Sequence, residues 1–146
     1  MFVSIALNQV DRKKLAEDIK GYRYKEAIQL MLSKKYQKSG NHDLYGGLLD
    51  LGVDDEYAYY LVGKFGDYAA EMKEQAIKTI KYSIILMALG VIGFCIALAT
   101  GRYIGSICIL ILAGTGQLIV FLIRKRQYEK VLTIIQQEKA LRDKQQ

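Results

Sequence analysis

Few residues of this chain have the types and spacing that catalysis or metal binding requires. His42 is the only histidine, and no cysteine lies near it to complete a zinc site. The acidic run Asp54 to Glu56 lacks the ligand spacing and central glycine of a calcium loop, so helix capping is its expected role. Gly46 and Gly47 have no Lys-Ser or Lys-Thr partner downstream, which a phosphate-binding loop needs. We therefore predict no catalytic residue, no metal, no cofactor and no enzymatic activity.

Gln117 is the polar residue most indicative of a specific interaction, because it lies in a largely apolar stretch. Its amide can bond to Ser83, to Thr115 or to a second copy of the chain. Such bonds contribute about 0.6 to 2 kcal/mol in membranes, and less often the residue belongs to a transport site. One glutamine makes a selective pore only where several copies surround it. We expect Gln117 to act in helix packing.

Two apolar stretches position this glutamine. Residues 82–100 and 103–123 contain no Asp, Glu, Lys or Arg, and only the turn 101–102 separates them. At about 1.5 Å per residue, either stretch as a helix covers about 28 to 32 Å, which matches the hydrocarbon thickness of a bilayer. In lipid, backbone groups must bond internally, so both stretches should be helical throughout. The sequence predicts a transmembrane hairpin over 81–123.

The orientation of the hairpin follows from its flanking charges. Basic residues are retained on the cytoplasmic side, and they flank the two outer ends of the hairpin while the turn holds Arg102 alone. We therefore expect an integral membrane protein of a plasma membrane, the inner membrane of a bacterium, with both termini cytoplasmic. The residues expected to contact anionic lipid are Lys78, Lys81, Arg124, Lys125, Arg126 and Lys130.

Small residues predict how the hairpin packs. Residues at equal depth have numbers that sum to about 203, which places Cys95 level with Cys108 and Gly90 level with Ala113 and Gly114. We expect two free thiols rather than a disulfide. Small residues let helix backbones approach, within one hairpin or between hairpins. The predicted packing or self-association set is Gly90, Gly93, Ala113, Gly114, Gly116 and Gln117.

Residues 1–80 are long enough for a small helical domain. The whole chain lacks proline, and apolar residues recur at spacings of three and four, which favours helices. A first helix carrying Leu15 and Ile19 should end at Gly21, in the left-handed position. A second should run from about Tyr24 to Tyr36 with an apolar stripe. Ser39 to Asn41 then indicates a break.

Two further helices are predicted before the membrane. Asn41 or Asp43 can cap a short helix that Gly52 closes. Asp54 can cap the next, where Val53 packs onto Ala58. Gly63 and Gly66 allow a kink or break there, with Asp67 restarting a helix into the first span. The further buried face is expected to be Leu61, Val62 and Phe65.

Two patterns suggest how the cytosolic parts associate. An offset of 31 residues pairs Gly21 with Gly52 and Ala27 with Ala58, which suggests two stacked helix-turn-helix units. The basic tail over 124–146 is predicted to be helical, with Val131, Ile134 and Leu141 as its apolar seam and Glu138 interrupting it. The tail can lie on the membrane, on a partner or on the cytosolic domain; we favour docking within the chain.

Charge is unevenly distributed. Residues 11–38 hold nine basic and four acidic residues, 41–74 hold two and eight, and 124–146 hold seven and three. Nucleic acid is an obvious partner for the first zone, but its closeness to a membrane argues against that use. The cationic face can instead lie on lipid headgroups, or dock on the acidic zone of its own or a neighbouring chain. We favour self-complementarity and do not expect nucleic acid as a partner.

The fold class expected is all-α: a two-helix transmembrane hairpin, preceded by a small cytosolic helical domain and followed by a cytosolic C-terminal helix. The expected function is a non-enzymatic, membrane-anchored interaction or scaffold protein. Its cytosolic domain would bind an unknown protein partner, and its hairpin would anchor it among membrane lipids and support a homo-oligomer. Two alternatives remain. A short hairpin with a cationic tail resembles holin-like, membrane-perturbing effectors, and the chain could also be a subunit of a larger membrane-protein complex.

Overall fold

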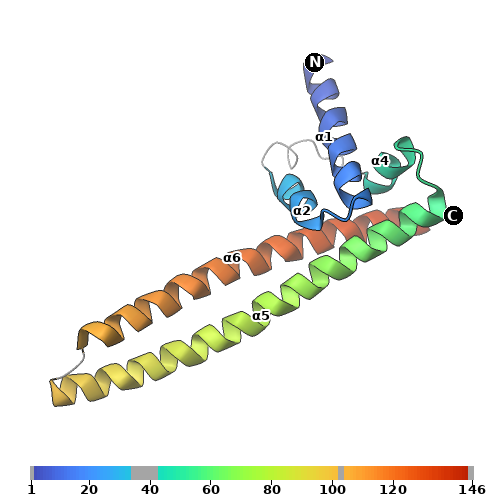
Figure 1. Ribbon diagram of the computed structural model, residues 1–146. Coiled ribbons are helices and arrows are strands. Elements are labelled where there is room, and N and C mark those ends of the chain that lie inside the picture. Colours follow the sequence, from blue (N-terminus) through green and yellow to red (C-terminus); the bar gives the residue numbers. More distant parts are fainter. Residues whose placement is uncertain (1, 34–42, 102–103, 145–146) are drawn as a thin grey trace. The chain divides into compact units, whose positions relative to one another are not determined.

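The computed structural model of this chain describes residues 2–33, 43–101 and 104–144. Over these ranges the chain forms helices and no strand (Figure 1), so the predicted all-α class is confirmed there. The residues Asn41, His42, Arg102 and Tyr103 lie outside the described ranges. The helices are α1 (Phe2–Lys20), α2 (Tyr24–Leu32), α4 (Leu44–Asp50), α5 (Asp55–Thr100) and α6 (Ile104–Asp143).

The chain divides into two compact units. The helical unit comprises Met1–Glu71 and Gln127–Gln146, and the hairpin unit comprises Met72–Arg126. The C-terminal part of α6 therefore belongs with the N-terminal helices. The assignment of residues 1–80 and 124–146 to the cytosol, and of 81–123 to a membrane, remains a prediction.

The core of the helical unit consists of the apolar faces that helical spacing predicts. Leu15 and Ile19 of α1 are buried, as are Ala27 and Met31 of α2. Residues at spacings of three and four share one face of a helix, so these pairs point to the same side. From α4 and α5, the fully buried side chains are Leu48, Ala58, Leu61, Val62, Phe65 and Ala69.

Acidic caps begin two of these helices. The Asp43 carboxylate accepts a hydrogen bond from the Gly46 backbone N–H at 2.8 Å, at the start of α4. The Asp54 carboxylate accepts one from the Glu56 N–H at 3.3 Å, at the start of α5. Each bond satisfies a backbone donor that the helix itself leaves without a partner. Asp43, rather than Asn41, is thus the cap that the structure describes.

Helices α1 and α4 end in the same kind of turn, in which one residue has a left-handed conformation, but that residue differs between them. Gly52 has φ +71°, and the Val53 N–H bonds to the Leu48 carbonyl at 3.2 Å, which is a Schellman motif. At the end of α1 the left-handed residue is Tyr22, with φ +57°, and not Gly21 as predicted. The bond from the Arg23 N–H to the Asp18 carbonyl, 2.8 Å, closes this turn one residue later than expected. Helix α2 likewise ends earlier than predicted, at Leu32.

No break occurs at Gly63 or Gly66, because α5 continues from Asp55 to Thr100. The short break that these glycines would allow is therefore not present, and the helix runs without interruption toward the apolar stretch. A Cβ built at Gly66 would lie 3.6 Å from Cγ2 of Ile135, and one built at Gly63 would lie 3.9 Å from Nζ of Lys139. These glycines lie where the C-terminal part of α6 packs against α5 in the helical unit.

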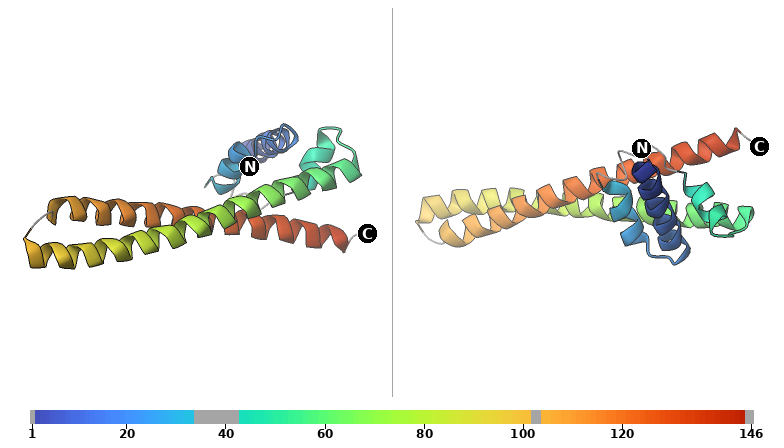
Figure 2. Two further views of the ribbon diagram at one scale, coloured as in Figure 1. Left: turned by 60° about the horizontal axis from the view of Figure 1, so that its bottom comes forward. Right: turned by 90° about the horizontal axis from the view of Figure 1, so that it is seen from above.

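Within the hairpin unit, α5 and α6 lie side by side and antiparallel, as both views of Figure 2 show. Gly101 ends α5 with φ +69°, and its N–H bonds to the Ala97 carbonyl at 2.8 Å. A left-handed residue reverses a helical chain with little steric cost only when it is glycine. The predicted turn at Gly101 is thus present. Arg102, the second residue of the predicted turn, lies outside the described residues.

Candidate functional site

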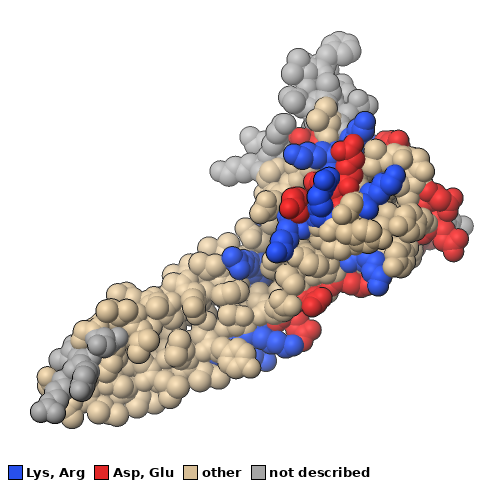
Figure 3. Space-filling model, viewed as in Figure 1, with Lys and Arg blue, Asp and Glu red and all other residues tan. Residues whose placement is uncertain are grey.

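The hairpin unit carries an uncharged apolar surface that the molecule does not cover. Both α5 and α6 contain a stretch long and apolar enough to cross a membrane. Only 11% of the most apolar stretch of α5, and 6% of that of α6, is buried. On the face shown in Figure 3, the hairpin next to its turn has no acidic or basic side chain. A soluble core helix would have most of this surface buried.

Three of the predicted small residues face the opposite helix within the hairpin. A Cβ built at Gly90 would lie 3.0 Å from Cγ1 of Ile111, and one at Gly114 would lie 3.1 Å from Cγ of Met87. A Cβ built at Gly93 would lie 3.8 Å from Cδ1 of Ile107. The expected pairing of Gly90 with Ala113 and Gly114 is therefore not observed. The Cβ positions of Gly90, Gly93 and Gly114 instead lie next to large side chains of the opposite helix, namely Ile111, Ile107 and Met87.

The other three members of the predicted set lie on the outside of the hairpin. Ala113, Gly116 and Gln117 are exposed, and a Cβ at Gly116 would meet nothing within 4 Å. In the described part of the chain, no hydrogen bond to the Gln117 side chain is found. The Thr115 hydroxyl donates to the Ile111 carbonyl of its own helix at 2.8 Å. Gln117 and Ser83 line one cavity, so the structure brings these two predicted partners near each other.

The basic residues predicted to contact lipid are solvent-exposed, with one exception. Lys81, Arg124 and Arg126 of the hairpin unit are exposed, as is Lys130 of the helical unit, whereas Lys125 is half-buried. Lys78 is exposed and pairs with Glu74 at 2.9 Å. The Arg124 guanidinium lies over the Phe121 ring, 5.3 Å from its centroid.

In the helical unit, a cluster of charged groups joins α1, α4 and α6. Arg12 pairs with Asp43 at 3.1 Å and with Asp50 at 3.0 Å. The Leu44 N–H donates to the Glu138 carboxylate at 3.0 Å. Burial raises the pKa of Glu138 to about 7, the Leu44 hydrogen bond and Arg12 lower it, and Asp43 raises it. This half-buried carboxyl therefore titrates near neutral pH.

The C-terminal part of α6 packs on the helical unit through a seam other than the predicted one. Val131 and Ile135 are buried, whereas Leu141 is exposed and Ile134 is half-buried. Glu138 continues the Val131–Ile135 face, so it joins the docked face and does not interrupt it. Further along, Arg142 pairs with Asp55 and lies 4.8 Å from the Tyr45 ring centroid. The spacing of 131, 135, 138 and 142 was the sequence signal for this face.

Tyrosines form a partly exposed cluster on the helical unit. Tyr22, Tyr57 and Tyr60 are 46% to 55% exposed. The Tyr22 and Tyr57 hydroxyls lie 3.3 Å apart, and the Tyr57 and Tyr60 rings stack at 5.9 Å. The Tyr57 hydrogen bond is the main cause that raises the pKa of Tyr22 to about 12. Tyr24 links this cluster to the buried Phe65, with 5.6 Å between ring centroids. Neither the cluster nor the left-handed Tyr22 was foreseen from the sequence.

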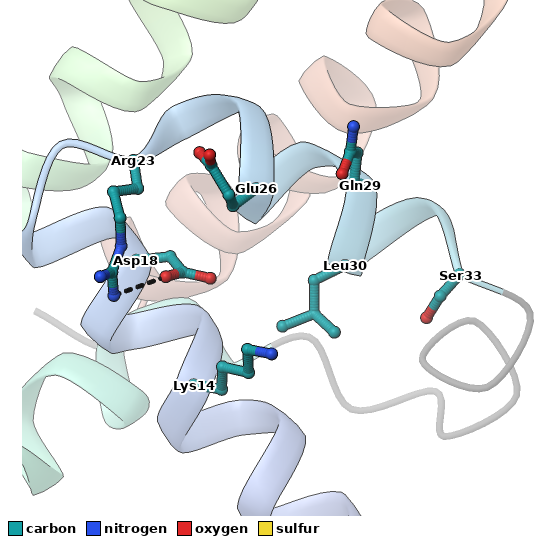
Figure 4. Close-up of a pocket in the computed structure, with 7 residues that line it drawn as sticks. All are labelled: Lys14, Asp18, Arg23, Glu26, Gln29, Leu30 and Ser33. Carbon is teal, nitrogen blue, oxygen red and sulfur yellow. Dashed lines mark ion pairs between the residues drawn. The ribbon is translucent and has the colours of Figure 1, made fainter.

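A cavity of about 520 Å³ opens on the helical unit (Figure 4). Asp18 and Arg23 form an ion pair of 2.7 Å in its wall. The wall also contains one further acidic residue, Glu26, and one further basic residue, Lys14. In the described ranges, no group of three or more His, Cys, Asp or Glu residues could hold a metal ion. The cavity is lined by Lys14, Asp18, Arg23, Glu26, Gln29, Leu30 and Ser33.

The two predicted glycines of α4 serve packing. A Cβ at Gly47 would lie 3.3 Å from Cβ of Ala16, and one at Gly46 would collide with the Arg12 and Asp43 side chains. Both glycines therefore allow α1 to approach α4 closely. No protein-family model matches this sequence, and no curated protein or solved structure shows significant similarity to it.

Proposed function

We propose that this chain is a non-enzymatic protein anchored in a plasma membrane, whose hairpin self-associates and whose helical unit binds a protein partner in the cytoplasm. The observation that carries the proposal is the uncovered apolar surface of the hairpin. Exposed Ile and Leu side chains cover both of its helices, including Ile109 at 68% and Leu112 at 72%. Soluble monomers rarely expose contiguous apolar patches above a few hundred Å². A bilayer removes that surface from water.

The charges at the ends of the spans support an orientation with both termini in the cytoplasm. Lys73, Lys78 and Lys81 precede the first span, and Arg124 to Arg126 follow the second. Basic residues near span ends remain on the cytoplasmic side. Attraction to anionic lipid contributes about 1 kcal/mol per basic group near the surface. This arrangement supports a cytoplasmic location for the helical unit.

Self-association is supported by the outward position of Gln117. An amide exposed to hydrocarbon finds no hydrogen-bond partner in lipid, whereas a second copy offers the same amide. Ala113 lies one turn away, and Gly116 leaves space for a neighbouring backbone. Such contacts contribute about 0.6 to 2 kcal/mol each, so several copies of the motif would be needed for a stable assembly.

Protein binding by the helical unit is supported by the tyrosine cluster Tyr22, Tyr57 and Tyr60. Tyrosine is enriched at protein interfaces, where its ring supplies apolar area and its hydroxyl a hydrogen bond. The left-handed conformation of Tyr22 costs roughly 1 kcal/mol or more relative to glycine. Retaining a tyrosine there is consistent with a use for its ring. Replacing Tyr57 and Tyr60 by serine should abolish capture of a cytosolic partner by the full chain.

The self-association proposal is tested by one glycine variant and a control variant on the same helix. Gly116→Leu blocks the open outer face and should reduce cross-linked oligomers in membranes. The fraction of chains that resists alkaline carbonate extraction should stay unchanged. Ile109→Leu, on an exposed part of the same helix, is the neutral control. If Gly116→Leu leaves the oligomers intact, the Gln117 face is not the contact between copies.

A membrane-perturbing effector is the second candidate, and the same outward Gln117 favours it, since several copies could surround a polar path. Its test is inducible expression in bacteria with a voltage-sensitive dye. Rapid depolarisation that Gln117→Leu abolishes would favour the effector. Normal membrane potential at full expression would favour the anchored interaction protein.

A further inference from the structure

A groove on the hairpin unit combines polar and apolar walls. It has a volume of about 300 Å³ and lies along α5, with Gln117 of α6 at its side. From Thr79 to Leu89 it follows ten residues of helix, which is about 15 Å along the axis. All of its lining residues belong to the hairpin unit.

The polar groups of this groove gather at one end. Thr79, Tyr82 and Ser83 lie toward the cytoplasmic end of the proposed first span, whereas Ile85, Leu86 and Leu89 lie deeper. Because Gly114 faces Met87, Gln117 lies one turn nearer the cytoplasm, close to the level of Ser83. The groove thus changes from polar to apolar along its length, as a phospholipid does between its glycerol esters and its acyl chains.

Basic residues stand next to the polar end. Lys78 and Tyr82 are one helical turn apart, and so are Lys81 and Ile85. Both lysines are exposed. Lys78 pairs with Glu74, whereas no ion pair of Lys81 is found among the residues that the structure describes. The rim of the groove therefore offers positive charge at the depth of lipid phosphates.

A second hairpin fits this groove less well than a lipid does. Close helix contacts in membranes use small residues, and those lie outside the groove at Ala113 and Gly116. The groove wall instead consists of Ile, Leu and Tyr side chains, which suit a flexible acyl chain. Charge complementarity at the rim selects an anionic headgroup over a zwitterionic one.

We propose that this groove binds one anionic phospholipid, with its phosphate at Lys78 and Lys81, its ester oxygens near Ser83, and an acyl chain along Ile85, Leu86 and Leu89. The assignment rests on the proposed membrane hairpin. It adds a defined lipid site to the general attraction of basic residues to the membrane surface.

The test uses the full chain in mild detergent with equal amounts of phosphatidylglycerol and phosphatidylcholine, followed by native mass spectrometry. Because Glu74 balances the charge of Lys78, the net positive charge at the groove is that of Lys81, which should give roughly a five-fold preference for phosphatidylglycerol. Leu89→Trp fills the groove and should remove the retained lipid. Leu112→Trp is the matched control, because Leu112 is also exposed, at 72% against 60% for Leu89, but lies outside the groove. The double variant Lys78→Gln, Lys81→Gln should retain both lipids equally.

Three results would overturn the lipid site. They are an absent preference for phosphatidylglycerol, equal lipid retention by the two tryptophan variants, and a loss of oligomers in Leu89→Trp without loss of lipid. The last result would make the groove a contact between copies. Carbonate extraction separates this failure from that of the proposed function. A chain released from membranes contradicts the hairpin itself, whereas a chain that stays but shows no lipid preference contradicts only the site.

Discussion

Replacing Glu138 by glutamine should remove a pH dependence from the stability of the helical unit. Burial raises the Glu138 pKa from 4.5 to about 7 in the folded chain. Between these values the folded state binds a proton that the unfolded state has lost. The free energy of unfolding therefore falls as pH rises from about 4.5 to about 7, and this contribution is constant above that range.

The magnitude follows from the size of the pKa difference. At about 1.36 kcal/mol per pH unit, the difference between 4.5 and about 7 gives an upper limit of about 3.4 kcal/mol. The side chain is only half-buried, and screening by solvent reduces this to roughly 1 to 2 kcal/mol. Glutamine keeps a carbonyl oxygen as acceptor for the Leu44 N–H and has no proton to lose. Glu138→Gln should therefore be more stable than the natural chain at pH 8 by roughly 1 to 2 kcal/mol.

The assay is urea unfolding of the full chain in mild detergent at pH 5 and pH 8, followed by the near-ultraviolet circular dichroism of tyrosine. All tyrosines except Tyr82 and Tyr103 lie outside the hairpin unit, so the signal reports mainly on the helical unit. Asp67→Asn, which removes an exposed carboxylate from α5, should keep the pH dependence of the natural chain. An unchanged pH dependence in Glu138→Gln would refute the reasoning, as would lower stability than the natural chain at pH 8.

Further substitutions test the packing with the same unfolding assay or with melting temperatures in detergent. Tyr45→Phe should raise the free energy of unfolding by about 1 kcal/mol, because the buried Tyr45 hydroxyl has no partner among the described residues; a destabilised variant would contradict this. Gly52→Ala should lower the free energy of unfolding by about 1 kcal/mol, because φ at Gly52 is +71° and alanine is strained there. Gly63→Ala, in the interior of α5, should raise the free energy of unfolding by about as much. Equal signs for these two would refute the turn geometry. Gly114→Leu should lower the melting temperature of the hairpin because its side chain meets Met87, whereas Gly116→Leu should not; equal losses would contradict the observed seam.

Local sequence signals predicted most of the helical framework. The capping residues Asp43 and Asp54, and the glycine turn at Gly52, act through neighbours within a few positions, so their chemistry can be read directly. The buried faces of α1 and α5 follow from apolar spacing for the same reason. Tyr22 is the exception, since glycine is the expected left-handed residue and Gly21 stands next to it.

Contacts between distant segments could not be derived in this way. The role of Glu138 depends on Leu44 and Arg12, which lie about a hundred residues away in the sequence. From the sequence alone, Gly63 and Gly66 indicate a possible helix break. The structure shows instead that both glycines lie next to side chains of α6. Counting residues from the turn gave the antiparallel pairing of the hairpin, but it did not predict that Ile111 and Met87 would lie next to Gly90 and Gly114.

The most direct test of the membrane hairpin is cysteine labelling in intact bacteria. Single cysteines would replace Lys20, Arg102 and Lys144 in turn, in a chain whose two native cysteines are changed to alanine. A membrane-impermeant maleimide should label the cysteine at position 102 in intact cells, and those at positions 20 and 144 only after permeabilisation. Labelling of position 20 or 144 in intact cells, or protection of position 102, would contradict a hairpin with both termini in the cytoplasm.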